Sequence, residues 1–301
     1  MTTFDHEHDA DRPLLDEIER YYDAVPRGGA RAEDFGPLTL FVREGSGWPF
    51  YARPNPDHGG PAVTVEGVRE VLARQRELGV PEAFEWVAER NPELRAAVEA
   101  AGLTVHEHPL LVLGPQDEPA AVPGAPEGVE VRVLAADAPE LAIAVAVPHL
   151  AFGEPGTAVG TAGTAELAAT AEKLTAEGWV ERTSGRIASG ATALAAAVQR
   201  TAVQQAAVQQ ADSAAVVLCA GQHNPVGAVT EVVGVGTLPA ARRQGLGLAV
   251  TEALVHHARA NGVRTVFLSA SDEDVARIYR RIGFRPFATA LIAEPAPAPE
   301  A

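Results

Sequence analysis

The residues best suited to chemistry lie in the stretch Val235–Gly247, where a strand-like run gives way to a loop and then to an amphipathic segment. Pro239 stops strand pairing, and the loop leads into a helix predicted over Gly245–Ala260, whose apolar residues recur at intervals of three and four. Backbone N–H groups at a helix start have no partner inside the helix, and with the helix dipole they favour an anion such as a phosphate. Gly245 and Gly247 have no Cβ, so a ligand can come close to the backbone. The stretch therefore predicts a phosphate-binding loop.

The distribution of charge agrees with an anionic ligand at this loop. The chain of 301 residues holds 40 acidic and 24 basic residues, a formal net charge of −16. Residues 239–287 hold eight arginines against four acids, so this segment is four charges positive within an acidic protein. Arginines on solvent-exposed helix faces would explain Arg277 and Arg281, but they explain the loop pair Arg242 and Arg243 less well. The acidic balance of the whole chain argues against a general nucleic-acid binder and against attraction to an anionic membrane surface.

Proline-rich segments predict a domain at 1–113, a linker at 114–128, a second domain at 129–294 and a disordered tail at 295–301. The four prolines of the linker fit neither a helix nor a central strand. The elements predicted in the second domain are strands at 129–134, 191–198, 215–222, 229–238, 263–269 and 284–293, and helices at 137–150, 164–177, 245–260 and 272–282. Asp137 and Asp272 are predicted to be N-caps. The repetitive segment 199–213 is predicted to connect a hairpin. The predicted class is α/β with a mixed sheet.

The first domain is predicted to be a fainter copy of the end of the second domain. Helices are expected at 66–78 and 92–101 and strands at 81–87 and 103–113, with Gly79 and Gly102 ending the two helices. Gly262 and Gly283 stand at the corresponding places in the second domain. The matching order indicates an internal duplication, and the alternative is that any two α/β halves look alike.

The loop resembles the acyl-CoA loop of the GNAT N-acetyltransferase superfamily, whose pattern is [RQ]-x-x-G-x-[GA] after a strand and a proline. Arg242–Gly247 fits this pattern, and Ala276–Phe284 looks like the second signature of the family, in which a tyrosine stands four residues before a Gly-Phe pair. The resemblance implies a GNAT-like fold with two units in tandem. In the first unit Val98 stands at the tyrosine position, and no R-x-x-G-x-G precedes the helix. The first unit is therefore expected to be degenerate, with one active site in the second.

The resemblance also implies which residues bind the co-substrate acetyl-CoA. The strand segment Val235–Thr237 would pair with the pantetheine arm, and Asp272 stands where the family often has an asparagine that contacts CoA. The pyrophosphate would be held by the loop, which comprises the side chains of Arg242 and Arg243 and the backbone amides of Gln244, Gly245, Leu246 and Gly247.

Two residues are candidates for proton transfer. Tyr279 matches the acid of the family, which would protonate the leaving thiolate. Glu231 is a lone acid in an apolar strand, and a carboxylate in such a place often has a function. It is predicted to be the base, with a substrate-amine anchor or a solvent-exposed residue of an edge strand as alternatives. His223, expected in the turn before that strand, is a reserve base, and Cys219 is expected to be an inert, buried strand thiol.

The sequence thus predicts an acetyl-CoA-dependent N-acetyltransferase that acts on a primary amine of a small molecule, and a cationic amine would suit the acidic chain. A non-catalytic acyl-CoA-binding regulator or scaffold is the alternative. His106 and His108 share a strand face without a third ligand, and Asp5–Asp9 is read as a charged terminus, so no metal is expected. A cytoplasmic location is expected because no signal or membrane-spanning segment is found, and a homodimer remains open.

Overall fold

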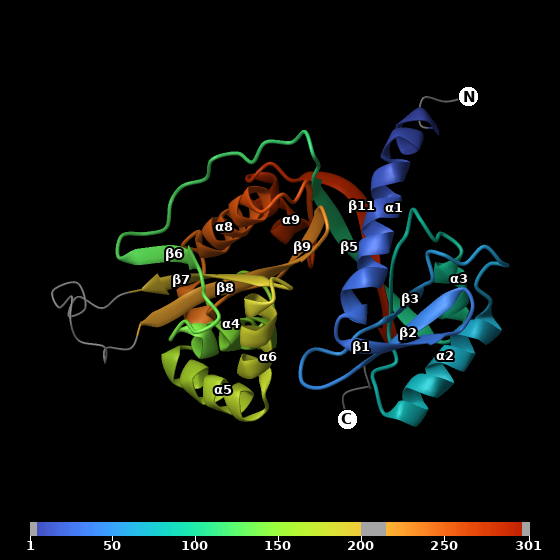
Figure 1. Cartoon of the computed structure of the whole chain (residues 1–301), viewed down its shortest axis with the longest axis horizontal. Helices are drawn as coiled ribbons and strands as arrows, with labels where there is room; N and C mark the ends of the chain where they lie inside the picture. Colours follow the sequence, from blue (N-terminus) through green and yellow to red (C-terminus); the bar gives the residue numbers. More distant parts are fainter. Residues whose placement is uncertain (1–4, 200–214, 297–301) are drawn as a thin grey trace. The chain divides into compact units, whose positions relative to one another are not determined.

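A computed structural model describes residues 5–199 and 215–296 of the chain, with side chains from residue 11 onward (Figure 1). Most of the predicted hairpin connection at 199–213 and most of the predicted tail at 295–301 lie outside the described residues. Contacts divide the chain into two compact units. The first comprises Met1–Leu110, Ser269–Glu273 and Pro286–Ala301, and the second comprises Leu111–Leu268 and Asp274–Arg285.

The first unit is a mixed sheet with helices. Its elements are α1 (Asp5–Arg27), β1 (Ala30–Asp34), β2 (Leu38–Arg43), β3 (Ala52–Pro54), α2 (Val65–Leu78), β4 (Phe84–Val87), α3 (Leu94–Ala100), β5 (Leu103–Leu113) and β11 (Arg285–Pro295). The strands follow the order β1-β2-β3-β4-β11, with β5 next. The elements predicted between 66 and 113 are confirmed, with shorter bounds for β4 and α3. The sequence analysis missed α1 and β1–β3.

The long helix α1 packs on this unit through an unusual buried acid. Glu19 is 4% exposed, and one oxygen of its carboxylate accepts hydrogen bonds from the Val87 N–H at 3.3 Å and from Asn91 Nδ2 at 3.1 Å. Burial raises the pKa of Glu19 to about 7, although Arg53 opposes the shift. Glu19 therefore ties the middle of α1 to the end of β4.

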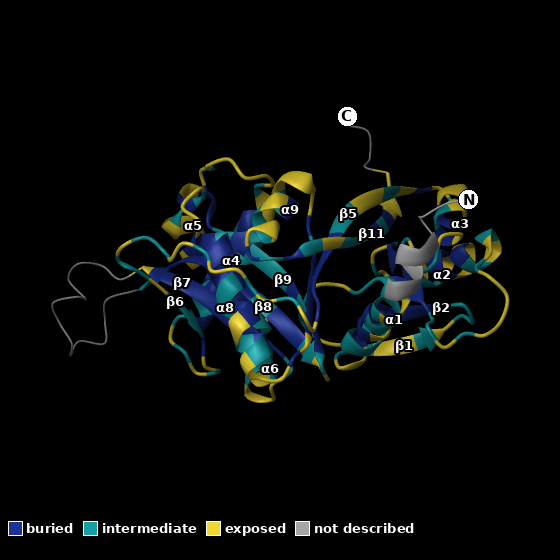
Figure 2. Cartoon of the chain, turned by 90° about the horizontal axis from the view of Figure 1, so that it is seen from above, coloured by how far each residue is buried: buried dark blue, intermediate teal, exposed yellow. Residues whose placement is uncertain are grey.

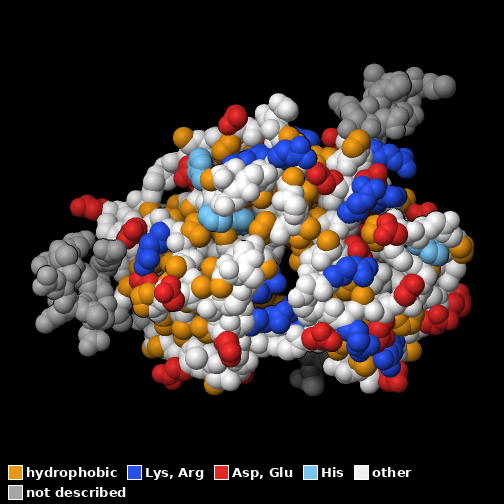
Figure 3. Space-filling view, in the orientation of Figure 1, with side chains coloured by type: hydrophobic (Ala, Val, Ile, Leu, Met, Phe, Trp, Pro, Cys, Tyr) orange, Lys and Arg blue, Asp and Glu red, His pale blue; other side chains and the backbone are white. Residues whose placement is uncertain are grey.

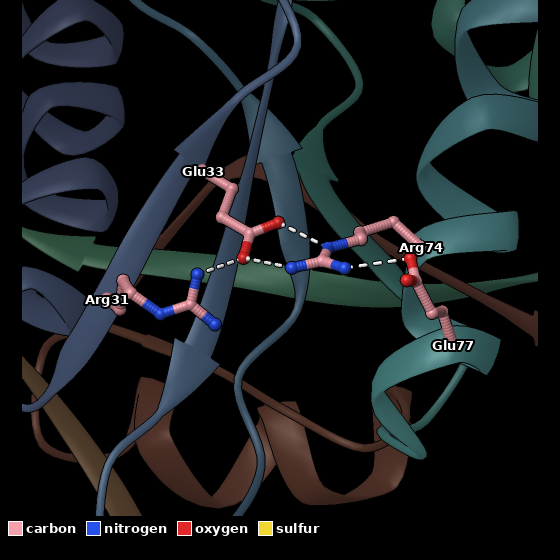
Figure 4. Close-up of polar contacts among 4 residues, drawn as sticks. All are labelled: Arg31, Glu33, Arg74 and Glu77. Atoms are coloured by element: carbon pink, nitrogen blue, oxygen red, sulfur yellow. Dashed lines mark hydrogen bonds and ion pairs between the residues drawn. The ribbon is translucent and has the colours of Figure 1, made fainter.

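A surface ion-pair network fastens α2 to the hairpin of β1 and β2 (Figure 4). Glu33 on β1 accepts two bonds from the Arg74 guanidinium of α2, at 2.8 and 3.0 Å, and a further bond from Arg31. Arg74 also contacts Glu77 at 2.7 Å. Chiefly because of the bonds from Arg74, the pKa of Glu33 falls to about 2.

Strand β11 belongs to the first unit, although the strand at 284–293 was predicted to close the domain 129–294. Ala290–Ala293 pair antiparallel with Phe84–Val87 of β4. Leu291 and Ala293 are buried in the core that α2, α3 and the strands of this unit form. The predicted domain 129–294 includes this strand, whereas its partner β4 and the core that buries Leu291 and Ala293 lie in the first unit.

The second unit is also a mixed sheet, with strand order β10-β9-β8-β7-β6 and β5 beside β10. Its strands are β6 (Val129–Val133), β7 (Ala193–Gln199), β8 (Val216–Val226), β9 (Val229–Thr237) and β10 (Thr265–Ser269). Its helices are α4 (Leu141–Gly153), α5 (Thr164–Ala176), α6 (Trp179–Ala188), the 3₁₀ turn η1 (Pro239–Ala241), α8 (Leu246–Ala260) and α9 (Glu273–Arg280). In Figure 1, α8 and α9 lie on one face of the sheet and α4, α5 and α6 on the other. Figure 2 shows buried residues concentrated along β7 and β8.

Three details of the second unit differ from the predictions. Helix α4 begins at Leu141, with Glu140 and not Asp137 at the N-cap, because residues 135–139 form turns. The amphipathic helix α6 was not predicted, and no residue of it is fully buried. The predicted linker at 114–128 forms no helix or strand, but it is bonded to the second unit, since Arg259 Nη2 donates to the Gly114 carbonyl at 2.8 Å. Among the described helices, none is long and apolar enough to cross a membrane.

Close packing of α4 on β9 at Gly236 gives a testable prediction. A Cβ at this position would lie 2.8 Å from Ala151 Cβ and 2.9 Å from Pro148 Cα of α4. We expect Gly236→Ala to lower the free energy of unfolding by about 1–3 kcal/mol in urea titrations. The matched control is Gly185→Ala in α6, where a Cβ meets no atom within 4 Å, and this change should be neutral or stabilise by up to about 1 kcal/mol. Equal stability of the two variants would contradict the close packing.

Candidate functional site

An opening in the sheet lies between β9 and β10. The two parallel strands pair only from Val229–Thr265 to Glu231–Phe267. Farther along, β9 carries a bulge, because Val233 and Gly236, three residues apart, face Gln222 and Ala220 of β8, two residues apart. Gly234 has a φ of 64°, which a residue with a Cβ adopts with strain. The strand therefore bends after Glu231, and its backbone beyond that residue has no pairing with β10.

The far end of β9 meets the start of α8. A Cβ placed on Gly247 would lie 3.7 Å from Thr237 Oγ1 and 3.9 Å from Val235 Cγ1. The structure thus brings together three residues that the sequence analysis selected for binding the same ligand. Thr251 one turn later bonds back to the Gly247 carbonyl at 2.8 Å, which fixes the first turn of the helix.

The first turn of α8 exposes backbone donors. Gly245 is its N-cap, with φ 76° and ψ 6°, and a glycine brings no side chain that could accept from the first N–H groups. Arg243 has a φ of 66° and is, within the described chain, the one residue other than glycine in the left-handed region. Turns with left-handed residues aim neighbouring N–H groups at one point, a geometry that binds anions. Arg243, Gln244 and Gly245 are exposed, and Leu246 is buried below them.

The helix that follows β3 in the first unit starts differently. Thr64 is the N-cap of α2, and its hydroxyl accepts a hydrogen bond from the Gly67 N–H at 3.1 Å. A side chain of the chain itself therefore occupies the position that an anion would take at α8. Val98, at the place of the tyrosine in the second unit, is fully buried in the core.

The two arginines of the loop have different surroundings. Arg242 is partly buried, and its guanidinium donates to backbone carbonyls, among them that of Ala151 near the end of α4 at 2.9 Å. Arg243 is exposed. Their roles in phosphate binding stay predictions, but only Arg243 combines exposure with the left-handed turn at the open helix start.

Tyr279 of α9 lies near Cys219 of β8, the residue that faces Thr237 of β9 across the strand pair. The Thr237 hydroxyl donates to Cys219 Sγ at 3.4 Å, across from it on β8. Burial raises the pKa of the Tyr279 hydroxyl, and the nearby Cys219 thiol adds to this shift. The phenol is therefore neutral at pH 7 and keeps its proton. Burial also raises the pKa of Cys219 to about 12, which agrees with the predicted buried, inert thiol.

Glu231 lies where β9 and β10 stop pairing. It is partly exposed, and it faces Asn224 of β8 across the strand pair. Thr230 is on the α8 face of the sheet, because it bonds to His223, which bonds to His257 of α8. Alternation along β9 therefore places Glu231 on the opposite face, the one that α4 and α6 cover. Arg186 of α6 donates to Asn224 Oδ1 there, at 3.0 Å. The alternative of an edge-strand residue was wrong, because β9 lies between β8 and β10 at this point.

His223 does not lie in the turn where the sequence analysis expected it. It lies in β8, is 1% exposed, and bonds through Nδ1 to Thr230 Oγ1 and through Nε2 to His257 Nδ1 of α8, each at 3.0 Å. Burial, and secondly His257, lowers its pKa to about 4. Figure 3 shows histidine side chains at the surface in the region of α8. The sequence analysis missed His257 as a partner, although it lies on the apolar stripe of its helix.

The remaining candidates are Asp272, His106 and His108. Asp272 directly precedes α9, is exposed, and accepts a bond from the Ser271 hydroxyl at 3.0 Å. Its contact with a cofactor stays a prediction. His106 lies 3.9 Å from Glu294, and His108 bonds to the Ser271 carbonyl. Within the part of the chain that the structure describes, no three potential ligands form a group that could hold a metal.

Burial of the neutral His223 gives a prediction about pH. Its pKa falls from 6.5 to about 4 on folding, so protonation opposes folding, and stability should be lost as the pH drops through this range, by up to about 3 kcal/mol. We expect His223→Gln to show a smaller loss over the same range in urea unfolding. The control His256→Gln, which changes an exposed residue of α8 next to His257, should lose as much stability as the wild type. An unchanged pH dependence in His223→Gln would refute this.

Comparison with known proteins gives a consistent result. Residues 191–284 match the acetyltransferase (GNAT) family. A solved GCN5-related N-acetyltransferase from Kribbella flavida has a TM-score of 0.62 and 23% identity, over 95% of this chain and 96% of that one. One from Sphaerobacter thermophilus has a TM-score of 0.54 and 17% identity over 88% and 83%. A tandem GNAT protein from the clavulanic acid biosynthesis pathway has a TM-score of 0.52 and 18% identity, over 87% of this chain and 79% of that one. These likenesses show the fold, and the search of curated proteins gives no match.

Proposed function

From the match of residues 191–284 to the acetyltransferase (GNAT) family, we propose that the protein transfers the acetyl group of acetyl-CoA to a primary amine of a small molecule. The observation that carries the proposal is the meeting of β9 and α8. There an unpaired strand edge leads to a helix start that no side chain of the N-cap residue satisfies.

The two parts of this arrangement fit the two ends of the CoA molecule. A pyrophosphate would accept hydrogen bonds from the first N–H groups of α8, beginning at Leu246 and Gly247, with the positive end of the helix dipole behind them. The exposed Arg243 would add charge. The β9 backbone from Val232 to Thr237 offers unpaired amide groups to the pantetheine arm, which itself contains amides.

Tyr279 and Glu231 fit the two proton transfers of the reaction. The amine nitrogen forms a bond to the acetyl carbon, and the carbon–sulfur bond breaks. Glu231, where the strands part, would take the proton from the attacking amine, directly or through a water. Tyr279 would give its proton to the sulfur that leaves, and its raised pKa keeps that proton in place until then.

We further propose that the first unit is a degenerate copy that binds no CoA. The support is local: Thr64 caps α2, and the buried Val98 stands in place of the tyrosine. Acetyl transfer to the amine would then be catalysed by the second unit only.

A single substitution tests the CoA site. Gly245→Glu adds a side chain at a left-handed position and a negative charge at the proposed pyrophosphate site. We expect acetyl-CoA affinity, measured by calorimetry, to fall at least about tenfold. The matched control is Gly190→Glu, which has a φ of 74° and open space around it, as Gly245 does, but lies after α6. The proposal fails if the two variants bind acetyl-CoA equally well.

Two further variants test the chemistry. Tyr279→Phe removes only the hydroxyl. It keeps the ring that packs edge-on against Phe284, with the two ring centroids 6.3 Å apart. With a panel of small amines, we expect release of the CoA thiol to slow about 10²-fold at unchanged acetyl-CoA affinity. Glu231→Gln should slow turnover similarly and remove the acidic limb of the rate–pH profile.

Turnover at the wild-type rate in both variants would remove these residues from the mechanism. Binding of acetyl-CoA by the wild type without turnover of any amine would instead favour a non-catalytic, acyl-CoA-binding role.

A further inference from the structure

The guanidinium of Arg242 lies at the C-terminal end of α4. Its Nη2 donates to the carbonyls of Ala151 at 2.9 Å and Glu154 at 2.5 Å, and its Nη1 donates to that of Ala158 at 3.1 Å. The last carbonyls of a helix have no partner within it and form the negative end of its dipole. A guanidinium suits this place because its planar fork spreads N–H donors over three nitrogens and can reach separated acceptors, whereas the three donors of a lysine sit on one nitrogen.

The loop after α4 is joined to the same place by bonds independent of Arg242. The Gly160 N–H donates to the Pro239 carbonyl at 3.0 Å, and the Ala240 N–H donates to the Ala162 carbonyl at 3.2 Å. The Glu154 carboxylate accepts from the N–H groups of Thr161 and Ala162, at 3.1 and 2.8 Å. Residues 154–162 and 239–242 therefore form one hydrogen-bonded structure just ahead of the open start of α8.

The backbone of the loop at Gly160 packs closely against Pro239 and Glu154. A Cβ at Gly160 would lie 2.8 Å from Pro239 Cβ and would collide with the Glu154 carboxylate. The segment that leads into α8 is thus held from one side by α4 and the loop after it. Only after Arg242 does the chain turn outward, through the left-handed Arg243, to the exposed residues at the helix start.

We propose that the two adjacent arginines divide the work: Arg242 is a positioning residue that clamps the α8 entry to the end of α4, and Arg243 is the arginine that meets the phosphate. This inference rests on the proposed CoA site. A phosphate would have to compete with three carbonyls for the Arg242 guanidinium, whereas Arg243 is exposed beside the first N–H groups of α8.

Lysine substitutions separate a clamp from a phosphate contact. Lysine keeps the positive charge and binds phosphate well, but it cannot bridge three carbonyls in the plane of a fork. We expect Arg242→Lys to weaken acetyl-CoA binding at least about tenfold, as Arg242→Ala does, and Arg243→Lys to keep most of the affinity. In calorimetry at several salt concentrations, Arg243→Ala should reduce the salt dependence of the affinity, and Arg242→Ala should leave it unchanged.

Hydrogen exchange of the free protein tests the clamp without any ligand. The amides of Gly160, Thr161 and Ala162 should exchange at least about tenfold faster in Arg242→Lys than in the wild type, and at the wild-type rate in Arg243→Lys. If the wild type binds no acetyl-CoA, the proposed function fails, while this comparison still decides whether the clamp exists. Wild-type exchange together with wild-type affinity in Arg242→Lys would overturn the proposal, and so would a reduced salt dependence in Arg242→Ala.

Two glycine substitutions test the same proposal if the Arg242 variants do not fold. Gly160→Ala presses the loop away from Pro239 and leaves both arginines intact, so it should weaken acetyl-CoA binding without changing its salt dependence. Its control is Gly153→Ala, at the end of α4, where a Cβ meets no atom within 4 Å. Equal affinity in Gly160→Ala and Gly153→Ala would contradict a clamp that acts on the CoA loop.

Discussion

The backbone N–H groups in the first turn of α8 need acceptors, and the N-cap residue Gly245 has no side chain to provide one. The other features of the second unit serve this exposed turn. The bulge at Gly234 directs the end of β9 toward it, and Thr237 packs beside Gly247. The parting of β9 and β10 leaves a free strand edge that leads to the same point. A ligand with an anionic end and an amide-containing arm satisfies both sets of groups.

The first unit shows what the same order of elements does when a side chain meets this need. Its helix α2 is capped by Thr64, whose hydroxyl accepts from the Gly67 N–H in the first turn. Val98 stands where the second unit has Tyr279, the proposed acid, and it contributes to the core. A polar cap and an apolar core residue add stability locally, whereas the first turn of α8 has no side-chain cap and, under the proposed function, would be stabilised by the ligand. Under the proposed function, a few residues on a similar order of elements would separate the unit that binds CoA from the unit that does not.

The sequence predicted most elements between residues 65 and 293, because one-sided burial imposes regular apolar spacing on them. It missed α1 and α6: α1 contains Pro13 and Pro26, and α6 buries none of its residues. The partner of β11 also escaped prediction, because pairing with β4 is decided by tertiary packing. In the site, the glycines of the loop were readable from sequence because their backbone needs are local. The bonds of Arg242 were not, because their acceptors are backbone carbonyls that any residue could supply.

Amide hydrogen exchange in the first turns of the two corresponding helices tests the central claim most directly. On addition of acetyl-CoA, the amides of residues 246–248 in α8 should slow at least about tenfold, because the ligand accepts their hydrogen bonds. The amides of residues 65–68 in α2 should not change, because Thr64 already caps that helix. Protection that appears in α2, or that is missing from α8 while acetyl-CoA is bound, would contradict the account.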